Sequence, residues 1–278
     1  MSIQDEENSK YWEELCGTAA ANSFGFDMSS ISGQNKFDSW YKDFYPYLFN
    51  YIKELGIENK SVLEVGLGLG TLSRHLALSS SDYVGVDIST NSCKYVAGTL
   101  AQRKLSGVTK NCSILELPKE FLSRFDFGIA IGSLHHTGDL KRAIKSLEEA
   151  VVPGGKILIM VYNEFDLRRI LKKPLRTLFH SLESLVGFKT TWQESESIMR
   201  GLNDADASGE SAPYTAFSSK KFFSRASGFA TSFHVYRNNF HDYSSYHHSL
   251  KRKNLLGLPA RLVGTDLYAF GQKHESKD

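Results

Sequence analysis

Short apolar runs alternate with longer stretches of helical spacing along residues 61–162. Five of the runs predict strands, at Ser61–Val65, Tyr83–Asp87, Val108–Ile114, Phe125–Gly132 and Lys156–Tyr162. The stretches between them predict helices over Leu72–Leu78, from an N-cap at Ser89 to Leu105, and over Asp139–Val151. Pro153-Gly154-Gly155 predicts a turn before the fifth strand. Strands separated by helices of this length form βαβ units, so the pattern predicts a parallel sheet with helices on both faces.

The segments on either side of this region have different patterns. Residues 1–60 are rich in aromatic side chains and predict an N-terminal helical lid. Residues 163–217 predict a helical insertion, with a helix-like stretch at Leu167–Lys189 that Pro174 interrupts and a polar loop at 201–213 that we expect to act as a lid. Residues 218–278 predict a helix and then the last two strands of the core sheet, at Phe229–Val235 and Leu262–Gly271.

Composition narrows the class of protein. The chain of 278 residues is 41% hydrophobic, which is enough for one substantial core, and its net charge of +2 gives no argument for a nucleic-acid partner. Its three cysteines are odd in number and widely spaced, which indicates reduced thiols. The first residues are polar and acidic, unlike a secretory leader, and the longest apolar run, at Ile157–Tyr162, is too short to cross a bilayer. We therefore expect a cytoplasmic protein.

The first predicted strand ends in alternate glycines, at Gly66, Gly68 and Gly70. Glycine lets the backbone turn sharply and lie against a ligand without a Cβ in the way. Glu64 stands two residues before the first glycine, so the pattern favours a ligand with positive charge.

Other polar residues follow neighbouring strands, at the edge where open α/β sheets bind ligands. Asp87 ends the second strand, where a carboxylate can accept hydrogen bonds from both hydroxyls of a ribose. Gly132 and Ser133 end the fourth strand, and His135 and His136 come directly after them.

Six motifs between residues 61 and 162 occur in the order and spacing of a known family. They are Leu63-Glu64-Val65-Gly66-Leu67-Gly68-Leu69-Gly70, Val84-Gly85-Val86-Asp87-Ile88-Ser89, Leu117-Pro118, Phe125-Asp126, Leu134-His135-His136 and Pro153-Gly154-Gly155-Lys156. With these motifs the chain resembles class I S-adenosylmethionine-dependent methyltransferases. The resemblance implies an S-adenosylmethionine-binding core at 61–162 within a Rossmann-like, doubly wound, seven-stranded sheet whose last strand is antiparallel.

The resemblance also implies a cofactor site for S-adenosyl-L-methionine. Glu64 and the backbone of Gly66, Leu67, Gly68 and Gly70 would hold the methionine portion. Asp87 would bind the ribose, Ile88 would pack against the adenine, and Gly132 and Ser133 would lie near the sulfonium. Many relatives carry an acidic residue for the adenine amino group where this chain has Ser113, next to Ile114. Ser113 can accept one hydrogen bond but lacks the charge.

The candidates for catalysis and acceptor binding lie around this site. An imidazole can take a proton from a hydroxyl or amine near neutral pH, so His136 and His135 are candidate general bases, with pocket lining as the alternative role. Tyr11, Trp12 and Tyr162 are candidates for acceptor binding, with core packing as the alternative. His234, His241, His247 and His248 lack partners at metal-ligand spacing, so we expect no metal.

Three functional hypotheses follow. The first is an S-adenosylmethionine-dependent methyltransferase that methylates oxygen or nitrogen of a small molecule by in-line displacement. The second is a protein that binds the cofactor without methyl transfer, as a cyclase or scaffold. The third is an NAD(P)-dependent oxidoreductase, whose fingerprint needs glycine where this chain has Thr71. A basic helical face within Leu167–Lys189 also allows a membrane contact, with a solvated face as the alternative.

Overall fold

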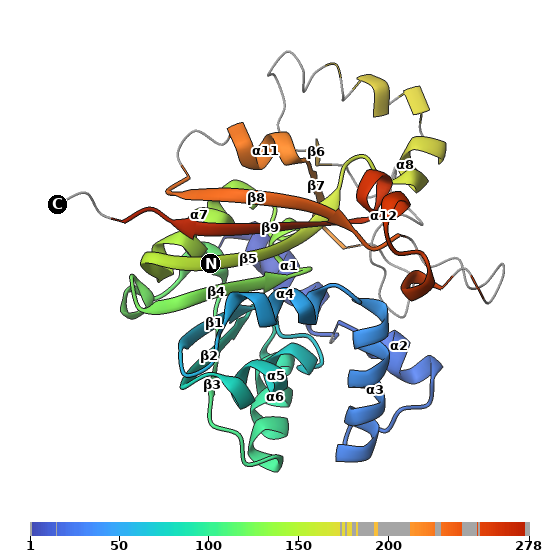
Figure 1. Cartoon of the computed structure of the whole chain (residues 1–278). Coiled ribbons are helices and arrows are strands. Elements are labelled where there is room, and N and C mark those ends of the chain that lie inside the picture. Colours follow the sequence, from blue (N-terminus) through green and yellow to red (C-terminus); the bar gives the residue numbers. More distant parts are fainter. Residues whose placement is uncertain are drawn as a thin grey trace.

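The computed structural model describes residues 2–14, 16–172, 212–225, 229–240 and 251–275, together with short pieces between 174 and 193 and Ser249. The described strands form one sheet (Figure 1). They are β1 (Ser61–Val65), β2 (Asp82–Asp87), β3 (Val108–Asn111), β4 (Phe125–Ile131), β5 (Val151–Asn163), β6 (Trp192–Gln193), β7 (Ala216–Ser218), β8 (Thr231–Asn238) and β9 (Asp266–Lys273).

Helices precede, connect and follow these strands. They are α1 (Ile3–Trp12), α2 (Thr18–Ser23), α3 (Ile31–Phe44), α4 (Leu48–Leu55), α5 (Thr71–Ser79), α6 (Thr90–Gln102), α7 (Leu140–Ala150), α8 (Leu167–Lys172), α11 (Lys220–Arg225) and α12 (Leu258–Val263). Single 3₁₀ turns occur at Ile114–Glu116, Lys119–Phe121, Leu134–His136 and Arg252–Asn254. Most of the stretch 173–211, including the predicted lid loop and the end of the predicted basic helix, lies outside the described residues.

The order of the main strands confirms the predicted Rossmann-like sheet. Strands β3, β2, β1, β4 and β5 are neighbours in that order and run parallel. The last strand, β9, runs antiparallel to β5 and also to β8 on its other side. The sheet also contains two short strands beyond the predicted seven, because β7 pairs with the end of β5 and β6 pairs with β7.

Two local predictions were wrong. Pro153-Gly154-Gly155 does not form a separate turn but lies inside β5, where the register with β4 shifts between Phe125 and Phe127. Gly154 adopts a φ of 77°, so the strand bulges and continues. The chain around Leu262 is helix α12 and not strand, because Pro at its first turn favours a helix and β9 begins only after Gly264.

Alternate residues of the buried strands face two separate hydrophobic clusters. Leu63, Ile157 and Ile159 pack with α7 and α11 in one cluster. Val62, Leu158 and Met160 pack with α4, α5 and α6 in the other. The sheet is therefore covered on both faces, as its continuously apolar strands predict.

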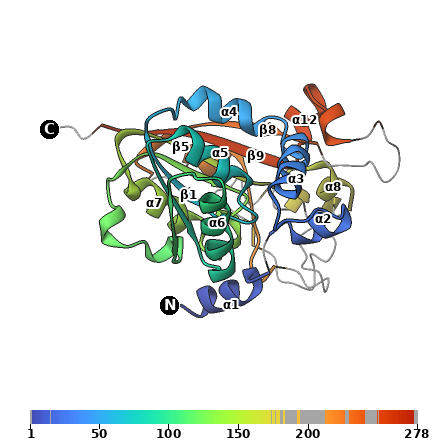
Figure 2. The ribbon, with the colours of Figure 1, turned by 90° about the horizontal axis from the view of Figure 1, so that it is seen from below.

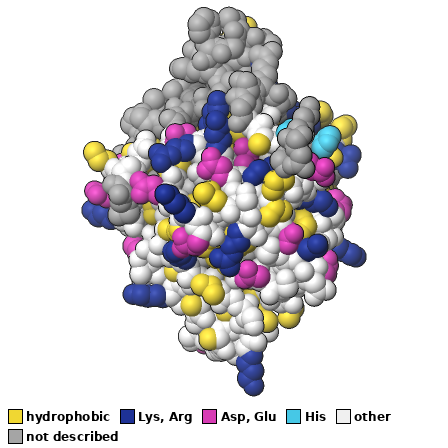
Figure 3. Space-filling view, turned by 90° about the vertical axis from the view of Figure 1, so that its left-hand side faces the viewer, with side chains coloured by type: hydrophobic (Ala, Val, Ile, Leu, Met, Phe, Trp, Pro, Cys, Tyr) yellow, Lys and Arg dark blue, Asp and Glu magenta, His cyan; other side chains and the backbone are white. Residues whose placement is uncertain are grey.

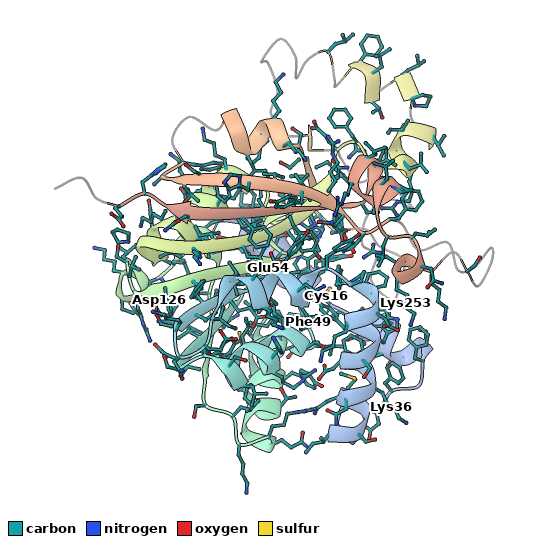
Figure 4. The ribbon with its side chains drawn as sticks, in the orientation of Figure 1. Cys16, Lys36, Phe49, Glu54, Asp126 and Lys253 are labelled. Carbon is teal, nitrogen blue, oxygen red and sulfur yellow. The ribbon has the colours of Figure 1, made fainter. Side chains whose placement is uncertain are left out.

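The helices before β1 are fastened to the core by polar contacts. Arg74 of α5 is 4% exposed and forms an ion pair with Asp38 of α3. The hydroxyl of Thr71 also donates to Asp38, at 2.6 Å. At the other end of α3, Lys253, which Figure 4 labels, pairs with Asp43. Figure 2 shows α1 below α6, apart from α2 and α3.

The surface and helix lengths add two observations. Figure 3 shows Lys and Arg side chains interspersed with Asp and Glu on the face that it presents. Within the described residues, no helix is long and apolar enough to cross a membrane.

Replacing Asp38 with Ala should lower the free energy of unfolding by about 3 kcal/mol, because it leaves the buried Arg74 guanidinium without its carboxylate. Urea denaturation of the two proteins measures the difference. Asp43→Ala is the matched control, because Asp43 and Lys253 are 58% and 43% exposed and such pairs contribute less than about 1 kcal/mol. Equal losses in the two variants would contradict a special role for the Arg74 pair.

Candidate active site

A cavity of about 250 Å³ lies at the carboxyl ends of β1, β2 and β4. Helices α1 and α3 supply much of its other wall, and aromatic and aliphatic side chains dominate its lining. Of the residues predicted from sequence, those in its wall are Trp12, Glu64, Gly66, Leu67, Gly68, Gly70, Asp87, Ile88, Ser113, Ile114, Gly132, Ser133, His136 and Tyr162. Tyr11 and His135 are not in the wall.

The glycine loop leaves no room for side chains on its inner side. Gly66, Gly68 and Gly70 have φ values of 86°, 48° and 72°, in the left-handed region that favours glycine. A Cβ on Gly66 would come within 2.3 Å of the Cβ of Ser133. Ser133 is itself held in place because its hydroxyl donates to the carbonyl oxygen of Val65 at 2.7 Å. The ends of β1 and β4 therefore approach each other closely.

Asp87 fixes the loop from the side of β2. Its carboxylate accepts hydrogen bonds from the backbone N–H of Leu67 at 2.7 Å and of Ser89 at 2.8 Å, and a further one from Gly68. Burial raises the pKa of Asp87, and these backbone donors oppose the rise. A carboxylate has about four acceptor sites, so these three bonds leave one for a ligand.

Glu64 lies deeper, at the base of the glycine loop. It is 1% exposed and accepts a hydrogen bond from the hydroxyl of Tyr83 at 2.5 Å. Burial raises its pKa to about 8, while the Tyr83 hydrogen bond and the Arg74 charge pull the pKa down. Glu64 is therefore mostly protonated at pH 7, and a cation bound beside it would favour the carboxylate.

Ser113 has a different environment from the one that sequence alone suggests. Its hydroxyl donates to the carboxylate of Asp5, on α1, at 2.7 Å, and accepts from the N–H of Leu115 at 3.1 Å. Asp5 and Asn8 of the same helix also line the cavity. Sequence analysis missed both residues, because polar side chains near the start of an acidic helix look like ordinary surface residues.

The two histidines have different positions. His136 is in the cavity wall, with its ring centroid 4.9 Å from that of Trp12, and its Nδ1 lies 2.9 Å from the carbonyl oxygen of Tyr214. A carbonyl only accepts, so Nδ1 carries the proton when it bonds to Tyr214. His135 is fully buried between His136 and Tyr162, with ring centroids 4.1 Å and 4.2 Å away.

An aromatic wall forms another part of the cavity lining. Its members come mainly from α3 and the residue after it, at helical spacing: Phe37, Trp40, Tyr41, Phe44 and Tyr45. The guanidinium of Arg252 lies 4.0 Å from the Phe44 ring centroid and forms a buried ion pair with Asp266, which supports the wall from behind. The aromatic richness of residues 1–60 was the signal for this wall, but the sequence did not say which rings reach the cavity.

Comparisons with known proteins agree on the class. Residues 63–157 match the family model described as a methyltransferase domain. A ubiquinone biosynthesis O-methyltransferase of Coxiella burnetii is 32% identical over 119 residues, which cover 42% of this chain and 50% of that protein. The chain thus spans about half the length of the curated relatives it matches.

Solved structures share the fold. A protein of Pyrococcus horikoshii is 15% identical, with a TM-score of 0.56 over 95% of this chain and 98% of that one. An S-adenosylmethionine-dependent methyltransferase of Methanosarcina mazei is also 15% identical, with a TM-score of 0.54 over 81% and 98%. Residues 63–157 therefore match a methyltransferase domain, and the chain has the fold of S-adenosylmethionine-dependent methyltransferases. The findings favour this class over the oxidoreductase alternative, and S-adenosylmethionine is the methyl donor of such domains.

The residues present fit that donor. The three glycines of Gly66–Gly70 let the backbone line the cavity as a cradle, and Glu64 can supply a negative charge beside it. The individual roles of Glu64, Asp87, Ile88, Gly132 and Ser133 toward the donor stay predictions.

Asp87→Ala should weaken binding of S-adenosylhomocysteine by about 1.5–3 kcal/mol, the contribution of hydrogen bonds to a charged group, and calorimetry should detect it. Unchanged affinity would remove Asp87 from the contacts.

Binding of S-adenosylhomocysteine at pH 7 should release a proton from Glu64. The free protein holds that carboxyl protonated because its pKa is about 8, and an ammonium group beside it favours the carboxylate. Affinity should accordingly rise as the pH rises toward 8. Calorimetry in buffers of different ionisation enthalpy measures the protons released.

Glu64→Gln should abolish this release. Glu54→Gln is the control, because Glu54 is exposed on α4, where Figure 4 labels it. Binding by the unmodified protein with no proton released would show that Glu64 does not receive the ammonium.

Proposed function

We propose that this protein is an S-adenosylmethionine-dependent methyltransferase that methylates a hydroxyl group of a small aromatic molecule. The observation that supports it best is that one cavity joins the glycine cradle, His136 and the aromatic wall of α3. A flat aromatic acceptor matches such a wall, because offset and edge-to-face ring contacts stabilise it there. The printed name of the Coxiella burnetii relative, an O-methyltransferase of ubiquinone biosynthesis, supports oxygen as the methylated atom.

In this proposal the chain positions the reactants and removes a proton. Bound S-adenosylmethionine supplies an electrophilic methyl group on its sulfonium. The Gly66–Gly70 backbone and Ser133 hold the donor end of the site, while Trp12, Trp40 and Tyr162 orient the acceptor ring and exclude water. Holding two reactants in line supplies roughly 7–11 kcal/mol of the barrier reduction.

His136 would take the proton from the acceptor hydroxyl. Its Nδ1–H is oriented by the Tyr214 carbonyl, and Nε2 is the atom proposed to take the proton. His135, buried behind it, would act by packing and not as a base. Residues 1–60 would provide much of the acceptor side of the cavity, in keeping with their predicted role as a lid.

The direct test incubates the purified chain with methyl-labelled S-adenosylmethionine and a set of phenols, catechols and small-molecule amines. We expect a labelled, O-methylated aromatic product and one equivalent of S-adenosylhomocysteine. Label on amines alone would contradict the proposed acceptor. Tight binding of the donor with no transfer to the set or to a cell metabolite extract would favour a cofactor-binding protein without transferase activity.

His136→Gln should lower kcat by about 10²- to 10⁴-fold, the usual contribution of a general base, and leave the affinity for S-adenosylhomocysteine unchanged. Steady-state kinetics and calorimetry measure the two quantities. His234→Gln is the control, because His234 is exposed on β8. An unchanged kcat would assign His136 to lining alone.

A further inference from the structure

Two buried acceptor atoms on α1 belong to residues that line the cavity, and they receive no hydrogen bond from the residues that the structure describes. They are Oδ2 of Asp5 and Oδ1 of Asn8. The two residues are 2% and 3% exposed, and both line the cavity. Buried polar atoms are nearly always paired, because leaving one unpaired forfeits its hydration without return. Such a pair on a cavity wall indicates a ligand that donates to both.

The surroundings fix the direction of both side chains. Asp5 and Asn8 are three residues apart on α1, so they lie on the same face of the helix. The other carboxylate oxygen of Asp5 accepts from Ser113 at 2.7 Å. The hydroxyl of Ser113 has a single proton, which it gives to Asp5, so it has none to give to a ligand. It also accepts from Leu115 N–H. Ser113 thus holds Asp5 in position and does not itself replace a carboxylate.

Helix α1 is also fastened beside the residues predicted to contact the nucleoside. The hydroxyl of Ser9 donates to the carbonyl oxygen of Ile88 at 3.3 Å. Glu13, after α1, accepts from the N–H groups of Thr90 and Asn91 at 2.9 Å and 3.0 Å, at the start of α6. Asp5 and Asn8 therefore stand near the end of β3 and close to Ile88.

We propose that Asp5 and Asn8 together recognise the exocyclic amino group of the adenine ring. This inference rests on the proposed function, because it takes S-adenosylmethionine as the ligand. An amino group offers two N–H donors, which matches two acceptor oxygens on one helix face. A 6-oxo purine offers an acceptor at the same position and would face the carboxylate of Asp5 with its own lone pairs. The N-terminal helix thus selects a 6-aminopurine, in place of an acidic residue at position 113.

The test measures binding, and not turnover, with S-adenosylhomocysteine and its 6-oxo analogue, S-inosylhomocysteine. The unmodified protein should bind the adenine compound about 10- to 100-fold more tightly, the range that hydrogen bonds to a charged group provide. Asp5→Asn should reduce this ratio to about 1–3, because the new amide can donate to a 6-oxo group. Glu6→Gln is the matched control, since Glu6 is exposed on the same helix and loses the same charge.

Three outcomes of these binding measurements would contradict the assignment of Asp5 and Asn8 or the proposed function itself. Equal affinity of the unmodified protein for the two compounds would overturn the inference while leaving the proposed function intact. Equal weakening of both compounds by Asp5→Asn would also overturn it, because a structural role alone would produce that result. If the unmodified protein binds neither compound, the proposed function fails first.

A second variant protects the test against misfolding. Asn8→Ala leaves the Asp5–Ser113 hydrogen bond in place and should weaken the adenine compound more than the 6-oxo compound. Thermal unfolding without ligand should be the same for Asn8→Ala, Glu6→Gln and the unmodified chain. A loss of the same size for both compounds in Asn8→Ala would count against the inference.

Discussion

The carboxylate of Asp87 joins the end of β2 to the loop after β1, and the geometry of the whole site depends on that junction. It accepts hydrogen bonds from the backbone of Leu67, in the glycine loop after β1, and of Ser89, at the start of α6. The loop can bend this sharply only with glycine at its left-handed positions. Ser133 closes the other side against Gly66 and Val65. Three strand ends are thereby held within contact distance, and the cavity opens above them.

The helices before β1 complete the site that the sheet begins. Asp38 of α3 is held by Arg74, which also donates to the carbonyl oxygen of Leu69, so the aromatic wall and the glycine loop are positioned by the same guanidinium. Helix α1 contributes Asp5 and Asn8 at one part of the cavity and Trp12 beside His136 at another. The core motifs therefore describe only part of the cavity wall. Another part, which would touch the acceptor, comes from the helices before β1.

The sequence predicted the sheet well because its signals are local. Apolar runs bounded by glycine placed β1 within the correct residues, and Ser89 was correctly expected to cap α6. The prediction failed at Pro153-Gly154-Gly155, where a bulge let the strand continue, and around Leu262, where a short helix precedes β9. Ser113 and Asp5 are 108 positions apart in the sequence. Because α1 is polar, it lacks the hydrophobic periodicity that would indicate which of its faces packs on the core. Sequence also could not show that His136 is in the cavity wall and His135 is not, because the two are neighbours in one 3₁₀ turn and both are buried.

The polar character of α1 has a consequence for how the cavity exchanges its contents. Besides the Trp12 ring, its contacts with the core include hydrogen bonds to Ser113 and Ile88, through Glu13 to the first turn of α6, and from Tyr214 to Glu7. Detaching such a helix exposes little apolar surface, so the change in heat capacity is small and water can replace the lost bonds. Helix α1, which we propose recognises the adenine ring, can therefore detach and let the ligand leave without unfolding of the sheet.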